Sequence, residues 1–231
     1  MKILAIDSSS KTATVALVDE KGIIGEYSIN YLRHSVILMP MIDELLKKCE
    51  VPINQITHVA VSEGPGSFTG LRIGAATAKG LAHALNIPIV GVSSLLALAY
   101  NVSEFEGLIC PLIDALNENV YGMLIRGGSL EILMDAKVYS LEEIAELVEG
   151  YSDKVLFVGE GVYSYKDKLR EMIRDKALFA KDKDNIARAA SIGEIAIQMI
   201  KKGEVFSFFD FKPVYIRKSA AEIRLGDRGV N

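Results

Sequence analysis

The first hundred residues alternate between short apolar runs and amphipathic helical patterns. Residues 2–7, 13–18 and 23–29 are apolar, β-prone and separated only by turn residues, which predicts three strands in meander order. From Ser35 to Lys48 the apolar positions recur at helical spacing. Strands and helices then alternate: a strand at 57–62, a helix at 70–85, a strand at 88–92 and a helix capped by Ser93 or Ser94. This alternation predicts a parallel layer that extends the meander.

A second, looser cycle of the same kind begins near Gly107. Strands are expected at 108–113, 119–126, 130–138 and 154–158, with helices after Ser140 and Gly161. The last third contains a helical pattern at 187–202 and an extended segment at 211–216.

Two related α/β halves, each a mixed sheet flanked by helices, are the simplest account of this order. We assign residues 1–103 to the first subdomain and 104–218 to a smaller second one. The helix at 187–202 is able to pack back on the first subdomain. Residues 219–231 are expected to form a mobile tail.

Composition limits the cellular context. The 231 residues are 50% hydrophobic and 24% charged, which allows a substantial core. No apolar run approaches the ~20 residues that cross a bilayer, and Asp7 interrupts the opening stretch too soon for a signal-peptide core. We therefore expect a cytoplasmic protein that does not contact membranes. In that reducing compartment Cys49 and Cys110 are expected to be buried free thiols.

The formal net charge of −4 does not favour nucleic-acid binding by the surface as a whole. Basic residues nevertheless gather late in the chain, at Lys201, Lys202, Arg217, Lys218, Arg224 and Arg228. They form either a solvated helix face and tail, which we favour, or a minor site for RNA.

The most informative segment is a glycine-rich turn between a predicted strand and a predicted helix. It reads Gly64-Pro65-Gly66-Ser67-Phe68-Thr69-Gly70, with Arg72 just beyond it. Glycine accepts unusual backbone conformations and a helix begins with unpaired amides, so a phosphate, a carboxylate or a neighbouring chain could bind there. The turn matches neither the dinucleotide fingerprint, because its sixth position is Thr69, nor a Walker loop, because no Gly-Lys-Ser or Gly-Lys-Thr occurs.

Small residues dominate the helix that follows this turn. Each interior glycine costs about 1 kcal/mol relative to alanine, so close packing must compensate. Gly74 and Ala78 lie four apart on one face, with Gly70 one turn earlier. That face packs either on the protein's own sheet or against a partner.

The preceding helix also carries apolar residues outside its core stripe. Val36, Ile37 and Pro40 gather in one turn, which is typical of a contact surface. His34, just before them, is interpreted as a cap or an interface residue. Together with Gly70, Gly74 and Ala78, these residues are the predicted partner interface.

A candidate nucleotide-binding turn, Asp7-Ser8-Ser9-Ser10, ends the first strand. An acidic residue followed by hydroxyls matches the first phosphate-binding turn of sugar kinases in position, but the glycine usual in such turns is absent. Asp and Ser clusters also form ordinary turns, so both interpretations stay open.

Four segments together resemble the bacterial TsaB (YeaZ) family. They are Ile3 to Ser9, His34-Ser35, Gly64 to Gly74, and Pro213-Val214-Tyr215-Ile216-Arg217. The resemblance implies the actin/sugar-kinase fold (ribonuclease H-like, ASKHA). It also implies a role in forming N6-threonylcarbamoyladenosine beside the anticodon of tRNAs that read codons starting with A. In the family picture the paralogue TsaD is the metal-bearing transferase, TsaE is an ATPase, TsaC makes threonylcarbamoyl adenylate, and TsaB pairs with TsaD.

The resemblance further implies that this chain lacks chemistry of its own. TsaD carries two metal-binding histidines just after the strand that follows the glycine motif, and Ser94 and Leu98 occupy those positions here. We expect no catalytic residue, no metal and no cofactor in isolation, with ATP or ADP bound only at an interface with partners. Leu116 stands where family members often have arginine, so any function of that arginine is in doubt.

Three functional hypotheses follow. The leading one is a non-catalytic scaffold or activator of TsaD, with TsaE as a further partner, tRNA reached indirectly and a homodimer when TsaD is absent. The second is an ATP-dependent phosphotransferase of the sugar-kinase fold, based on Asp7 and the glycine loop. The third is direct binding of tRNA.

Overall fold

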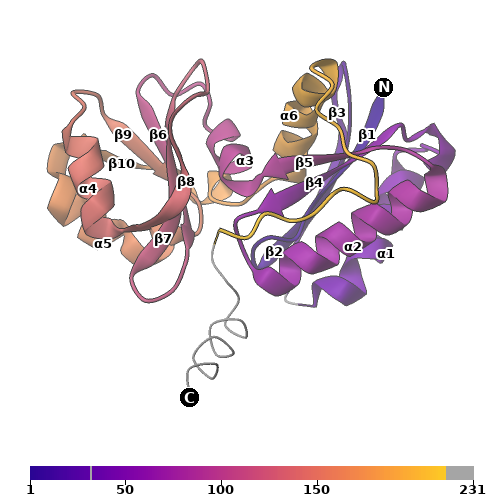
Figure 1. The fold of residues 1–231 in the computed structure, drawn as a ribbon, viewed down its shortest axis with the longest axis horizontal. Coiled ribbons are helices and arrows are strands. Elements are labelled where there is room, and N and C mark those ends of the chain that lie inside the picture. Colours follow the sequence, from indigo (N-terminus) through magenta and orange to yellow (C-terminus); the bar gives the residue numbers. More distant parts are fainter. Residues whose placement is uncertain (32, 217–231) are drawn as a thin grey trace.

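Both halves of the chain build the same kind of sheet (Figure 1). The computed structural model describes residues 1–31 and 33–216. The first half contains β1 (Lys2–Asp7), β2 (Thr12–Asp19), β3 (Gly22–Asn30), α1 (His34–Lys48), β4 (His58–Gly64), α2 (Phe68–Leu85), β5 (Ile89–Ser93) and α3 (Ser94–Tyr100). The second contains β6 (Leu108–Asp114), β7 (Asn119–Arg126), β8 (Glu131–Ser140), α4 (Leu141–Glu149), β9 (Val155–Val158), α5 (Gly161–Ile173) and β10 (Ala177–Phe179). The last helix is α6 (Ala189–Lys201).

The strand order is the same in the two sheets. Within the described residues, one sheet has the order β3-β2-β1-β4-β5 and the other β8-β7-β6-β9-β10. In each, the first three strands form an antiparallel meander, and the fourth and fifth join in parallel. The predicted meander and parallel extension are confirmed, and with them the ASKHA-type α/β fold. The short strand β10 completes the repeat and was not expected from the sequence.

Each sheet is covered on both faces, which explains why its central strands are apolar throughout. In β1, Leu4 and Ile6 pack with residues of α1 and α2, while Ile3 and Ala5 pack with residues of α6. The second sheet is covered by α4 and α5 on one face and by α3 on the other. Figure 1 shows α1 and α2 on the opposite side of the first sheet from α6.

The C-terminal part of the described chain returns to the first lobe. Helix α6 packs on the first sheet, and the segment 204–216, which we call the strap, continues along it. Phe206 pairs with Ile89 at the edge of β5 through N···O distances of 2.8 and 2.9 Å, and Phe211 is buried in the core. Helix α6 and the strap thus pack against the first sheet.

The environment of the thiols agrees with the sequence expectation in part. Cys49 and Cys110 are both free; Cys110 is buried and Cys49 is half-buried. None of the helices in the described ranges has the length and apolarity that a bilayer crossing requires. The tail 219–231 and Arg217 of the last family segment lie outside the described residues.

The two connections between the lobes are joined by one side chain, Asn101. Its Nδ2 donates to the carbonyl oxygens of Asp184 at 2.9 Å and Ile186 at 2.7 Å. Its Oδ1 accepts a hydrogen bond from the Ser191 hydroxyl at 2.7 Å. The first crossing, after α3, is thus tied to the second, before α6.

We predict that Asn101→Ala lowers the free energy of unfolding by about 2 kcal/mol, because two half-buried carbonyls and a hydroxyl lose their partner. Urea denaturation measures the change. Asn54→Ala is the matched control, since Asn54 is exposed in a short 3-10 turn and should be neutral within about 0.5 kcal/mol. Equal stability of the two variants would show that Asn101 does not join the crossings.

Candidate functional site

The glycine-rich turn packs directly on the turn that ends β1. The amide of Ser67 donates to the carbonyl oxygen of Ser9 at 2.7 Å, and the hydroxyl of Ser8 donates to the carbonyl oxygen of Gly70 at 2.9 Å. The Ser67 hydroxyl accepts from the amide of Gly70 at 3.2 Å and caps α2. Because of this cap, α2 begins at Phe68, two residues before the predicted start.

Two glycines are required by this contact. A Cβ on Gly66 would lie 2.5 Å from the carbonyl oxygen of Ser9, and a Cβ on Gly70 would overlap the carbonyl oxygen of Ser8. Both obstacles are backbone atoms, which cannot turn away as a flexible side chain would. The space at the head of α2, where the sequence allowed a phosphate, a carboxylate or another chain, is filled by the protein's own backbone.

The candidate nucleotide turn is largely closed as a consequence. Asp7, Ser8 and Ser9 are buried, and of the four predicted residues Ser10 alone is among those that line the cleft between the lobes. The structure therefore gives no access to Asp7, Ser8 or Ser9 for a nucleotide, which corrects their assignment as ligand-binding residues. Burial raises the pKa of the Asp7 carboxyl above its ordinary value, although the nearby hydroxyls of Ser62 and Ser9 lower it.

His34 ties the start of α1 to the same turn. It is 5% exposed, and its Nε2 donates to the carbonyl oxygen of Ser10 at 2.8 Å. Arg33, and not His34, is the residue that precedes the first helical turn. The interpretation of His34 as a cap or interface residue is therefore wrong for the folded chain: the imidazole is an internal anchor.

The small residues of α2 lie on two different faces. Gly70, Gly74 and Ala78 are buried, and a Cβ on Gly74 would lie 2.5 Å from the Ser8 hydroxyl. These three positions pack on the protein's own first sheet, so their assignment to a partner interface is corrected. The outward face instead carries Ala76 and Gly80, again four apart, and a Cβ on Gly80 would meet only open space.

Apolar residues are exposed at the beginning of α1. Val36 is 62% exposed, Pro40 is exposed, and Ile37 is half-buried against the core. Met39, which was not predicted, is 48% exposed and belongs to the same turns of the helix. Its position three residues after Val36 was the available sequence signal. We call Val36, Met39, Pro40, Ala76 and Gly80 the α1–α2 face.

The remaining motif residues meet the strap. The guanidinium of Arg72 lies 3.8 Å from the centre of the Phe68 ring, and its Nε donates to the Tyr215 hydroxyl at 3.3 Å. The amide of Val214 donates to the carbonyl oxygen of Glu63 at 2.7 Å. Pro65 is buried and Thr69 is exposed. This part of the motif thus fixes the strap to the head of α2.

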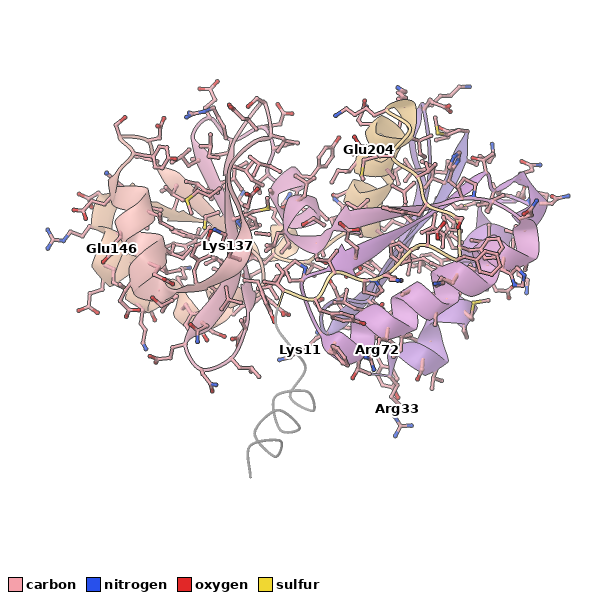
Figure 2. The ribbon with its side chains drawn as sticks, in the orientation of Figure 1. Lys11, Arg33, Arg72, Lys137, Glu146 and Glu204 are labelled. Carbon is pink, nitrogen blue, oxygen red and sulfur yellow. The ribbon has the colours of Figure 1, made fainter. Side chains whose placement is uncertain are left out.

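A cleft of about 740 Å³ lies between the lobes. Its residues come from the glycine loop, the end of β6, the strap and the turn after β1, and include Lys11, Phe68, Leu116, Glu160 and Tyr215. Figure 2 shows Lys11 at the opening between the lobes and Arg72 on α2. Burial raises the pKa of Glu160, while the charge of Lys11 lowers it.

Leu116 lies on an unusual turn at this cleft. Leu116, Asn117 and Glu118 have φ angles of 66°, 55° and 61°, all in the left-handed region that non-glycine residues rarely adopt. The amide of Leu116 donates to Asp114 Oδ1 at 2.8 Å, which stabilises the turn. The side chain of Leu116 is 68% exposed. Sequence reasoning noted the missing arginine but not this exposed leucine.

The structure offers no metal site in the part of the chain that it describes: no three His, Cys, Asp or Glu side chains are grouped to hold an ion. Ser94 and Leu98 are both buried in α3, with Leu98 packed among apolar residues. A leucine side chain has no donor atom for a metal.

Comparison with known proteins decides the family. A family model described as "TsaD: tRNA N6-adenosine threonylcarbamoyltransferase" matches residues 12–225. The Bacillus subtilis protein "tRNA threonylcarbamoyladenosine biosynthesis protein TsaB" is 35% identical over 228 residues, which covers 97% of each chain. The chain belongs to the TsaB (YeaZ) family.

Solved structures of this family have the same fold. A Pseudomonas aeruginosa protein described as having "similarity to peptidase YEAZ" superposes with a TM-score of 0.82 at 27% identity, covering 94% of this chain and 99% of that one. A more distant structure, an activator of 2-hydroxyisocaproyl-CoA dehydratase from Clostridium difficile with bound ADPNP, has a TM-score of 0.56 at 10% identity and covers 93% of this chain and all of its own. This second likeness concerns the fold alone.

Alanine at two glycines of α2 should act in opposite directions. We predict that Gly74→Ala destabilises the chain by about 1–3 kcal/mol, because the added methyl displaces the Ser8 hydroxyl from its bond to Gly70. Gly80→Ala should stabilise it by up to about 1 kcal/mol, since the site is open and alanine favours helix. Urea denaturation of the two variants compares these effects. If both substitutions changed the free energy of unfolding in the same direction, the assignment of the two faces would be wrong.

The pH dependence of stability should change in Asp7→Asn. Because burial raises the pKa of Asp7 in the folded chain, the unfolded carboxyl loses its proton first as pH rises. Folding is thereby penalised from about pH 4 upward, and the penalty becomes constant above the folded pKa. The asparagine variant has no carboxyl at this position and therefore no such penalty. Relative to the parent it should therefore become more stable as the pH rises from about 4, until the pH passes the raised pKa of the folded carboxyl.

Thermal unfolding at several pH values measures this difference. A stability difference between Asp7→Asn and the parent that does not vary with pH would contradict the raised pKa.

Proposed function

We propose that this chain is a non-catalytic scaffold or activator of the TsaD transferase in the formation of threonylcarbamoyladenosine in tRNA. The names of its relatives supply the pathway. The observation that carries the scaffold role is the α1–α2 face, an exposed surface of apolar and small residues. The other candidate binding site, the space at the head of α2, is occupied by the backbone of the turn after β1.

The interior of the chain supports the absence of catalysis. Ser94 and Leu98 stand where the paralogue has its metal ligands, and both are buried among the chain's own residues. The phosphotransferase alternative relied on Asp7 and the glycine loop. Asp7 is buried, and the loop bonds to the hydroxyl of Ser8 and the carbonyl oxygen of Ser9. A role carried by the outer surface therefore agrees better with the geometry than a reaction at this turn.

The α1–α2 face has the chemistry of a helix-packing surface. Val36 and Met39 supply apolar area, and full burial of such side chains stabilises a complex by about 1.5–3 kcal/mol each. Ala76 and Gly80 let another helix approach closely. The chain's own packing does not require glycine at position 80, because a Cβ there would meet open space. The cost of Gly80 in helix stability is therefore offset only if a partner packs closely against it.

The remaining expectations complete the proposal. The α1–α2 face binds TsaD, or a second copy of this chain when TsaD is absent. TsaE joins the assembly, tRNA is bound by the assembly and not by this chain alone, and ATP or ADP binds only at an interface with partners. An assembly that modifies tRNA acts in the cytoplasm.

Reconstitution tests the function. TsaC, TsaD and TsaE are incubated with tRNA, threonine, bicarbonate and ATP, with or without this chain, and the modified nucleoside is quantified. We expect modification to require the chain. Undiminished modification without it would contradict the activator role. Turnover of threonylcarbamoyl adenylate by the chain alone, or strong calorimetric binding of ATP with magnesium, would favour a catalytic role instead.

Substitutions on the α1–α2 face test the docking surface. We predict that Val36→Asp weakens the affinity for TsaD at least tenfold, because the complex would bury an unpaired carboxylate. Gly80→Arg should have the same effect by steric obstruction. Both residues are exposed, so circular dichroism and thermal unfolding should remain close to the parent.

The matched control is Ile132→Asp, which places the same charge at an apolar residue on β8 in the other lobe, 48% exposed. Its affinity for TsaD should equal that of the parent. Loss of binding in the control, or unchanged binding in both variants of the α1–α2 face, would rule out this surface.

A further inference from the structure

One side of α2 carries basic residues and no carboxylate. Arg72, Lys79 and His83 follow one another at spacings of seven and four residues, which places them on the same side of the helix. None of the 18 residues of α2 is Asp or Glu, although the whole chain has a formal net charge of −4. This side of α2 therefore has the opposite charge to the chain as a whole, and it attracts anions.

The strap lies along this side of α2 and adds aromatic rings to it (Figure 1). Near the end of the helix the ring centres of His83 and Phe208 are 4.7 Å apart, and those of Phe208 and Phe209 are 4.3 Å apart. Phe209 is 73% exposed, more than any other large apolar side chain among the described residues. Near the start of the helix, Tyr215 is 43% exposed beside the guanidinium of Arg72.

Lys79 holds a cation beside the exposed ring of Phe209. Its Nζ donates to the backbone carbonyl oxygens of Phe209 at 3.4 Å and Phe211 at 3.0 Å. The neighbouring carboxylate on the strap, Asp210, accepts a hydrogen bond from the Ser207 hydroxyl at 2.6 Å. The name α2–strap seam is used below for Arg72, Lys79, His83, Phe209 and Tyr215.

Exposed rings and basic groups along one seam have the chemistry of a site for single-stranded nucleic acid. Every base has a face that stacks on an aromatic ring, and every phosphate pairs with a cation. From Arg72 to His83 the helix rises about 17 Å, which is longer than a single nucleotide. The ring of Phe209 and the ammonium of Lys79 are adjacent, so a base and its phosphate can be bound together.

An apolar protein segment is a poorer occupant of the seam. It would cover Phe209 and Tyr215, but it would also take Arg72 and Lys79 out of water without supplying an opposite charge, which costs free energy. A nucleic acid covers the rings with its bases and pairs the cations with its phosphates. The charge of the seam therefore favours nucleic acid.

We propose that the α2–strap seam binds an unpaired stretch of RNA, with bases stacked on Phe209 and Tyr215 and phosphates paired with Lys79 and Arg72. The choice of RNA rests on the proposed function in tRNA modification. TsaD occupies the α1–α2 face, and the RNA lies on the strap side of α2. Two stacking contacts supply less free energy than a micromolar complex requires, so the seam adds to the tRNA affinity of the assembly and binds RNA only weakly by itself.

The affinity of the complex with TsaD for tRNA tests this contact. The full-length chain is bound to TsaD, and the complex is titrated into a fluorescently labelled tRNA transcript. We expect Phe209→Leu to weaken tRNA binding at least about fivefold, since leucine is apolar but has no ring for stacking. Phe209→Trp should bind as tightly as the parent. Tyr163→Ala is the matched control: it removes a 59% exposed ring from α5 in the other lobe and should have no effect.

The salt dependence of the same affinity tests the phosphate contact. Lys79→Gln should reduce the slope of log K against log salt concentration by about 0.7, the value for one phosphate contact on a single strand. A slope equal to that of the parent would exclude Lys79 as a phosphate ligand and would overturn the proposed arrangement.

The affinity for TsaD, measured separately, distinguishes the possible failures. Phe209→Leu should bind TsaD as tightly as the parent. A lower affinity for TsaD would assign Phe209 to a protein interface, and unchanged tRNA binding would show that no base stacks on it; either result overturns the proposal. If the parent did not bind TsaD, the proposed function would fail, and the RNA site would be decided on the isolated chain.

Nuclear magnetic resonance detects weak binding by the isolated chain. The sequence contains three histidines, so few ring signals need to be assigned. At constant pH, adding oligouridylate of about ten nucleotides at about millimolar concentration should shift the ring signals of His83 and leave those of the buried His34 unchanged. Phe209→Leu should reduce the shift of His83. If the signals of His83 did not move, or moved equally in the variant, the seam would not bind RNA.

Discussion

The contact between the glycine-rich loop and the turn after β1 is the constraint on which the rest of the structure depends. Ser67 bonds to Ser9 and Ser8 bonds to Gly70, so the head of α2 is held against the end of β1. His34 bonds to the adjacent carbonyl of Ser10 and fixes the start of α1 at the same point. Both helices of the α1–α2 face are therefore positioned by one buried turn.

This contact also decides where function can lie. The amide donors and glycines at the head of α2 have the general composition of an anion site, but the protein's own backbone occupies the space. The carboxylate of Asp7 and the hydroxyls of Ser8 and Ser9, which resemble a phosphate-binding turn, are buried. Among the described residues, the outer face of α1 and α2 and the cleft between the lobes remain accessible for binding.

The two halves repeat one topology but do not share the chain equally. Helix α6 and the strap both return to the first lobe. Helix α6 covers the second face of its sheet, and the strap pairs with Ile89 at the edge of β5 and buries Phe211 on the face of α1 and α2. Covering that edge removes unpaired backbone groups that would otherwise invite strand pairing. Asn101 then ties together the two crossings between the lobes that bound the cleft.

The sequence alone determined the types and order of the main elements, the repeat of meander and parallel strands, and the family, because periodicity, turn residues and motif spacing are local properties. It left open whether the Gly74–Ala78 face of α2 packs on the protein's own sheet or against a partner. Only the tertiary structure shows that this face is interior, that His34 is buried and that Leu116 is exposed. Those outcomes depend on contacts between residues far apart in the chain, such as Ser8 with Gly70 and Glu63 with Val214, which no local pattern encodes.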